Sequence, residues 1–162
     1  MKDFSNFITI QNDDIDFSRE IDSLKKTKCV NTHKNIGAIT TFLGTVRDLN
    51  EGCSVNSMFL EHYPGMTELS IEKILKKTFD KWPVLSVRVI HRVGLLSPGD
   101  NIVFIGVGSE HRKISFDACE YIMDYLKTKA PFWKKEVTSN GERWVKAKVD
   151  DDVAVRNWES NS

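Results

Sequence analysis

The sequence predicts a single α+β domain whose sheet is mainly antiparallel. Several segments are rich in β-branched and aromatic residues, whereas two longer segments repeat apolar residues at helical spacing. The pair Asn140-Gly141 favours a hairpin between two strand-like segments, because both positions tolerate positive φ. No internal repeat or low-complexity linker divides the 162 residues, so we expect one domain over 1–150 and a polar, loosely held tail over 151–162.

The first half of the chain predicts two helices and two strands. Residues 36–46 and 55–63 are strand-like and flank a polar loop, so we expect these two strands to pair. The expected elements are a helix within 14–27, a strand over 36–46, a loop over 48–54, a strand over 55–63 and a helix between Pro64-Gly65 and Pro83.

The second half predicts further strands around a long helix. Residues 102–107 are apolar throughout, which is typical of a strand buried on both faces. The helix must end before Ala130-Pro131, because the residue before a proline avoids helical geometry. The expected elements are a strand over 84–90, a turn over 97–100, a strand over 102–107, a helix over about 113–129 and hairpin strands over 132–138 and 143–149.

Composition narrows the class of protein. Lys plus Arg and Asp plus Glu both number 23, and this zero net charge argues against a dedicated nucleic-acid binder. The three widely spaced cysteines favour reduced thiols over disulfides, and no apolar run has the roughly 18 residues that a membrane span needs. We therefore expect a cytoplasmic protein without a membrane segment.

Lys127 is the first candidate for chemistry. It lies four residues after Met123, at the edge of the apolar stripe of the predicted helix. Such a lysine can lay its stem on the core and extend its ammonium into water. It can equally be a partly desolvated amine that serves as a nucleophile or proton carrier. Position alone leaves both interpretations open.

Other cations follow predicted strands. His111 and Arg112 stand between a strand and a helix start, where anions are readily held, although a polar loop with a salt bridge is an equal alternative. His91 and Arg92 form a second such pair at the end of the 84–90 strand, although Arg92 can instead be a structural cation beneath the Gly94 turn. Arg47 follows a strand end, and Lys134 and Lys135 should point to opposite faces of their strand, so at most one shares a pocket with Lys127. Phosphate-loop, dinucleotide and metal-ligand motifs are absent, and we expect neither a metal nor a cofactor.

Six segments together resemble the family of large, catalytic subunits of molybdopterin synthase. They occur in family order between residues 37 and 147, and their combination is specific. The segments are GAITTFLGTVRD (37–48), LEHYPGMTE (60–68), VIHRVGLLSPGD (89–100), SEHRKISFDA (109–118), MDYLKTKAPFWKKE (123–136) and GERWVKA (141–147).

The resemblance implies a fold and a reaction. The fold is an α/β hammerhead with additional antiparallel strands. The reaction converts cyclic pyranopterin monophosphate into molybdopterin by inserting two sulfurs as a dithiolene. The sulfur arrives on the thiocarboxylated C-terminal glycine of a small ubiquitin-like subunit. Two catalytic subunits form a homodimer at the centre of a heterotetramer.

The resemblance also implies site residues. Lys127 and Lys134 match the two essential lysines, and Arg47, His111 and Arg112 match positions that bind the anionic groups of the substrate. Neighbouring pocket segments contain Thr45, Val46, Lys135 and Glu136. Where some relatives carry an arginine, this chain has Lys148, which keeps the charge and loses the bidentate fork. A non-catalytic anion-binding scaffold of the same fold is the competing hypothesis.

Overall fold

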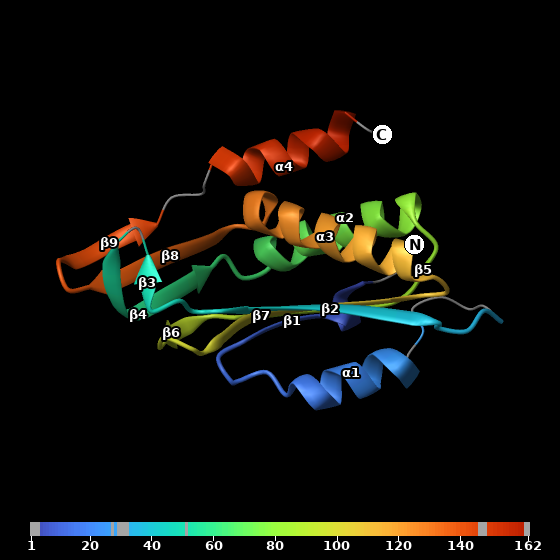
Figure 1. Cartoon of the computed structure of the whole chain (residues 1–162), viewed down its shortest axis with the longest axis horizontal. Coiled ribbons are helices and arrows are strands. Elements are labelled where there is room, and N and C mark those ends of the chain that lie inside the picture. The colour runs from blue at the N-terminus through green and yellow to red at the C-terminus, as the bar shows by residue number, and fades with distance from the viewer. Residues whose placement is uncertain (1–3, 27, 29–32, 51, 146–148, 161–162) are drawn as a thin grey trace.

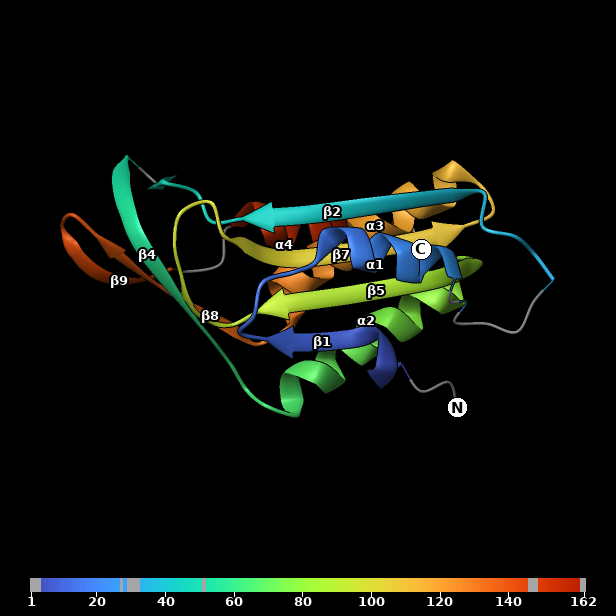
Figure 2. The same ribbon diagram turned by 90° about the horizontal axis from the view of Figure 1, so that it is seen from below.

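The computed structural model describes residues 4–26, 28, 33–50, 52–145 and 149–160. A four-stranded sheet forms its centre, in the order β1 (Ile8–Gln11), β5 (Val84–Arg92), β7 (Asn101–Ser109) and β2 (Ala38–Thr45) (Figure 2). Only β1 and β5 run parallel, and the other neighbours in this sheet are antiparallel. The expected buried strand is confirmed, since residues 103–109 of β7 are all buried.

Helices cover both faces of the central sheet. Helices α2 (Met66–Lys81) and α3 (Arg112–Lys129) lie on one face, and α1 (Phe17–Lys26) lies on the other (Figure 1). A short 3-10 helix, η1 (Ser5–Phe7), precedes β1. The larger core fills the space beneath α2 and α3, where Ile71, Leu75, Ile105, Val107 and Ile122 are fully enclosed. The sequence predicted all three helices, while β1 was missed.

A second sheet curls away from one end of the first (Figures 1 and 2). It contains β3 (Leu49–Asn50), β4 (Cys53–His62), β8 (Phe132–Thr138) and β9 (Gly141–Val145) in that order, and β6 (Gly94–Leu96) also pairs with β4. The predicted hairpin is confirmed, but Thr138 pairs with Gly141, so the loop is Ser139-Asn140 and β9 begins at Gly141 where the sequence predicted a strand from 143. The result is one α+β domain with mainly antiparallel strands, as expected.

The expected pairing of residues 36–46 with 55–63 is wrong. β2 pairs with β7 in the central sheet, whereas β4 pairs with β8 in the second sheet. The loop between β2 and β4 has structure of its own. Its strand β3 folds back on β4, and the Val55 N–H donates to the Asp48 carbonyl at 2.8 Å. The local hairpin carries β4 out of the central sheet and leaves β7 as the partner of β2.

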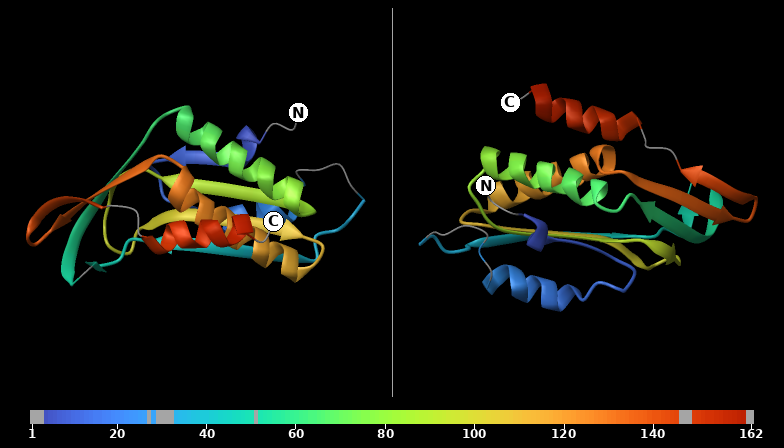
Figure 3. Two further views of the ribbon diagram at one scale, coloured as in Figure 1. Left: turned by 90° about the horizontal axis from the view of Figure 1, so that it is seen from above. Right: turned by 180° about the vertical axis from the view of Figure 1, so that it is seen from behind.

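The C-terminal residues form a helix, which corrects the expectation of a loose tail. Helix α4 (Val149–Ser160) packs over α3 (Figure 3). Val155 is 4% exposed, and the Trp158 ring contacts Tyr121 while its indole N–H donates to Asp124 at 2.8 Å. Val155 and Trp158 lie three residues apart, so one face of the helix carries both. The burial of Val155 and the packing of Trp158 on Tyr121 hold this segment on α3, although most of its residues are polar.

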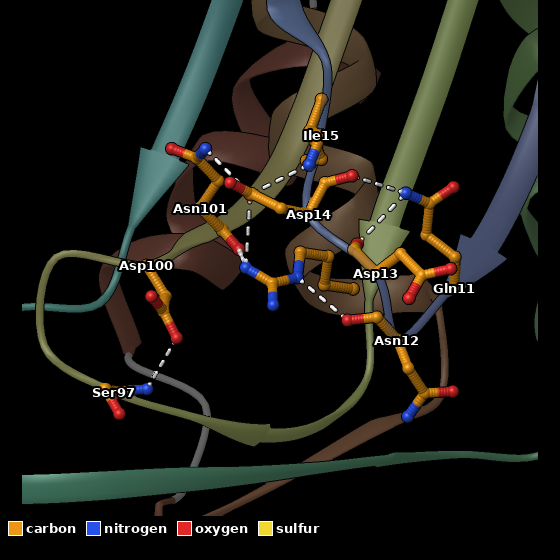
Figure 4. A network of polar contacts seen from close by, with 9 residues as sticks. Gln11, Asn12, Asp13, Asp14, Ile15, Ser97, Asp100 and Asn101 are labelled. Atoms are coloured by element: carbon orange, nitrogen blue, oxygen red, sulfur yellow. Dashed lines mark hydrogen bonds and ion pairs between the residues drawn. The ribbon is translucent and has the colours of Figure 1, made fainter.

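Arg92 has the structural role that the sequence indicated. Its guanidinium is nearly buried and donates to the Asn12 carbonyl, the Asp14 carboxylate and the Asn101 carbonyl at 3.1–3.2 Å (Figure 4). Asn101 in turn donates to Asp14 at 2.9 Å. The cation therefore fastens the segment after β1 to the start of β7.

Candidate active site

A cavity of about 540 Å³ opens where the two sheets meet. Its lining combines residues from the end of β2, the start of β7, the C-terminal part of α3, the inner face of β8 and the start of α4. The lining residues that carry charge are Arg47, Lys127, Lys134, Glu136 and Asp151. Two of the five are acidic, so the cationic cavity expected from the sequence contains its own counter-charges.

The position of Arg47 is fixed by the backbone bonds of Val46 and by a hydrogen bond from the Arg47 side chain to Asn50. Val46 is buried in a small apolar cluster, and its backbone bonds both Gly99 and Asp100 across the 97–100 turn at 2.8–2.9 Å. The exposed Arg47 then donates from Nη2 to the Asn50 side-chain oxygen at 3.1 Å. Val46 therefore anchors the strand end without lining the cavity, and Arg47 points its guanidinium along the cavity wall.

A hydrogen-bonded chain continues from Arg47 into the second sheet. Asn50 donates from Nδ2 to Glu136 Oε1 at 2.8 Å, and Arg143 donates from Nε and Nη2 to Glu136 Oε2 at 3.1 Å each. Glu136 is only 2% exposed, so this ion pair and amide bond satisfy a buried carboxylate. Glu136 acts as the fixed anion that orients the Asn50 amide and, through it, Arg47.

Lys134 and Lys127 face the same cavity. Burial lowers the pKa of the Lys134 amine, and the nearby Lys127 and Arg47 charges lower it further, against the opposing charges of Asp151 and Glu136. Lys127 is less enclosed, with 45% of its side chain exposed, and its ammonium lies 3.4 Å from an Asp151 carboxylate oxygen. The site thus holds one desolvated amine beside one ion-paired amine.

Lys135 points to the other face of β8, as the strand alternation predicted. Its ammonium pairs with Glu142 at 3.1 Å and lies 5.8 Å from the centre of the Trp144 ring. It is not among the cavity-lining residues, whereas Thr45 and Glu136 are. The last expected site residue, Lys148, lies outside the described residues.

His111 and Arg112 lie far from the cavity within one chain. Both follow β7 at its C-terminal end, where Ser109 pairs with Ala38, while the cavity lies at the opposite end, where Asn101 pairs with Thr45. Arg112 begins α3, and Lys127 lies 15 residues later, which separates them by about 22 Å along the helix axis. A single copy of the chain therefore brings Arg47, Lys127 and Lys134 together, without His111 and Arg112.

Comparison with known proteins places this fold and cavity in a family. The family model described as "MoaE protein" matches residues 10–129, which is most of the chain. The chain belongs to the MoaE family. The resemblance predicted from the six segments is thus confirmed.

Relatives of this MoaE chain share its length as well as its sequence. It is 53% identical over 124 residues to the molybdopterin synthase catalytic subunit of Pseudomonas aeruginosa, covering 76% of this chain and 83% of that one. For the catalytic subunit of Vibrio cholerae the identity is 45%, covering 94% and 97%. A solved MoaE protein from Burkholderia ambifaria superposes with a TM-score of 0.78 at 48% identity, covering 94% and 97%. The molybdopterin synthase structure from Staphylococcus aureus superposes at 0.74 with 29% identity, covering 85% and 96%.

Among the polar residues in and behind the MoaE cavity, Asn50, Arg143 and Asp151 received no role from the sequence. Asn50 lies in the segment expected to be a loop, Asp151 lies in the expected tail, and Arg143 lies in a segment of the resemblance to which no role was assigned. The Arg143 contact had a partial signal: the sequence predicts the hairpin, but a turn centred on Asn140-Gly141 would pair residue 136 with residue 145, whereas the structure pairs Glu136 with Arg143. No such signal exists in the sequence for Asn50 and Asp151. Asn50 bonds Glu136, 86 residues away in the chain, and Asp151 bonds Lys127, 24 residues away.

His91 is buried and uncharged at the back of the MoaE cavity. Its ring stacks on Phe132 at 3.7 Å between centroids, its Nδ1 lies 2.8 Å from the Arg92 carbonyl, and burial lowers its pKa from 6.5 to about 4. Because the unfolded chain takes up this proton at higher pH than the folded chain, stability should fall as the pH drops from about 6.5 to about 4. The loss attributable to His91 is at most about 3 kcal/mol.

Urea unfolding across that pH range measures the effect. The wild-type protein should lose more free energy of unfolding than His91→Gln, because the variant lacks the titrating ring. Equal pH slopes in the two proteins would show that His91 does not contribute.

Proposed function

We propose that this chain is the catalytic subunit of a molybdopterin synthase, a sulfurtransferase. It converts cyclic pyranopterin monophosphate into molybdopterin with sulfur from the thiocarboxylated C-terminus of a small ubiquitin-like subunit. The observation that carries this proposal is the meeting of Arg47, Lys127 and Lys134 in one cavity of a MoaE family chain. The catalytic-subunit relatives from Pseudomonas aeruginosa and Vibrio cholerae support it.

The charges of the cavity suit two anionic reactants. A thiocarboxylate and a cyclic phosphate repel each other, and fixed cations offset that repulsion and stabilise negative charge that develops in the transition state. Lys127 is exposed enough to meet the incoming thiocarboxylate. Lys134, whose pKa is lowered by burial, gives up a proton more readily than an ordinary lysine and shares the acyl- or proton-transfer work.

Arg47 binds the anionic groups of the substrate, and Thr45 lines the cavity close to it. Glu136 supports Arg47 through Asn50 and is already paired with Arg143, so it acts by positioning. Lys135 and Val46 support the walls from outside the cavity. The reaction is expected in the cytoplasm, which suits the free thiols of Cys53 and Cys119.

A second copy of the chain is the source of His111 and Arg112 in this proposal. Within one copy the length of α3 keeps them away from Lys127, whereas a homodimer can present the start of one α3 to the cavity of the other copy. The assembly is then a central dimer of catalytic subunits with one small subunit on each.

Arg47→Ala and Arg112→Ala should both weaken binding of the cyclic substrate by roughly tenfold, because each removes a charge-assisted contact. Equilibrium binding of cyclic pyranopterin monophosphate measures this loss. Mixing the two variants should yield some dimers in which one cavity is intact, and those should recover tight binding at that site. If both variants bind weakly and the mixture, after subunit exchange, recovers no tight sites, Arg112 does not complete the cavity of the other copy.

The function is tested by reconstitution. The full chain is mixed with a thiocarboxylated small subunit and cyclic pyranopterin monophosphate, and dithiolene product is assayed. Product formation supports the synthase. Tight binding of both reactants without turnover would instead support the non-catalytic scaffold.

A further inference from the structure

Asp151 is a cavity residue that the proposed reaction does not use. It is the third residue of α4, only 21% of its side chain is exposed, and it lines the cavity opposite Lys127. The rest of α4 fixes this position, because Val155 is buried and the Trp158 indole N–H donates to Asp124 on α3. The anchored helix keeps the Asp151 carboxylate over the cavity.

The carboxylate occupies the place of an anionic reactant. Its oxygen lies 3.4 Å from the Lys127 ammonium, and its charge also favours the protonated form of Lys134. The other acid of the cavity, Glu136, is bonded to both Arg143 and Asn50. Among the described residues, in contrast, Asp151 has Lys127 as its one hydrogen-bond partner, and Lys127 has only Asp151.

We propose that Asp151 is the internal counter-ion of this cavity, which an incoming anion must displace from Lys127. With no reactant bound, the ion pair between Asp151 and Lys127 reduces the electrostatic repulsion among the cations of the cavity. When an anion binds, Asp151 yields its place, and after the reaction it competes with the product for Lys127. Asp151 therefore sets how tightly the cavity holds anions. The inference rests on the proposed function only in taking the natural ligand to be an anion.

A structural alternative predicts a different pattern. Acidic residues in the first turn of a helix are stabilised by the helix dipole, and Asp151 and Asp152 both satisfy that rule. Asp152 is exposed and does not line the cavity, so it is a matched control with the same charge at the neighbouring position. A helix-dipole role would make the two substitutions equivalent.

The experiment is a calorimetric titration of the full-length protein with inorganic phosphate. Asp151→Asn should bind phosphate about three- to tenfold more tightly than the wild type, since it removes both the competing ion pair and a repulsive charge. Asp152→Asn should change the affinity by less than about twofold, since exposed charges are well screened. In a Lys127→Ala background, Asp151→Asn should give a clearly smaller gain, because only the repulsive charge is then removed.

Four results would overturn the inference. They are an unchanged or weaker affinity in Asp151→Asn, an equal gain in Asp152→Asn, a gain of undiminished size without the Lys127 amine, and no detectable phosphate binding by either the wild type or Asp151→Asn. Because the titration needs no sulfur donor and no turnover, it succeeds or fails independently of the synthase assay.

Discussion

Lys127→Ala should lower the rate of dithiolene formation on the order of 100- to 1000-fold, so that little product is detected. The reason is that the variant removes a cavity ammonium that is 45% exposed and therefore accessible to an incoming thiocarboxylate. Binding of the small subunit should persist, because a protein interface spreads over many more contacts than one lysine. Single-turnover assays with the thiocarboxylated partner measure the first effect, and a pull-down measures the second.

Lys129→Ala is the matched control. Lys129 is exposed two residues further along α3 and does not line the cavity, so its loss should leave the rate unchanged. Full activity in Lys127→Ala would remove Lys127 from the mechanism. An equal loss in both variants would point to damage to the end of α3 rather than to a missing amine.

Glu136→Ala should destabilise the fold by about 3 kcal/mol, the largest stability effect we expect at the site. The substitution leaves the Arg143 guanidinium without its buried partner and the Asn50 amide without its acceptor. The buried Asn50 amide then loses the acceptor of its N–H, and Arg143 loses its bonds to the carboxylate while its bond to the Asn50 carbonyl remains. Denaturant unfolding measures the free energy. Because Asn50 also holds Arg47, the variant should in addition bind the cyclic substrate more weakly.

Glu142→Ala provides the comparison for that variant. Glu142 forms its ion pair with Lys135 at the surface of the same hairpin, with 61% of its side chain exposed. Surface pairs contribute little, so we expect a change within about 0.5 kcal/mol. If the two variants lost similar stability, the buried position of Glu136 would not be what makes its pair important.

Local features of the sequence determined much of the fold. The apolar spacing of 113–129 predicted α3 to within a residue at its start, and Ala130-Pro131 marked its end. Asn140-Gly141 predicted the hairpin of β8 and β9, and the alternation of side chains along β8 sends Lys134 and Lys135 to opposite faces. These outcomes depend on neighbours within one helix or hairpin, so residue spacing carries them.

Other features were decided only by the tertiary structure. The pairing of β2 with β7 in place of β4, the docking of α4 on α3, and the approach of Asp151 to Lys127 all join segments far apart in the chain. No local spacing encodes such contacts. They arise because buried apolar faces and buried polar groups must find partners, and those partners are fixed only when the whole chain is packed.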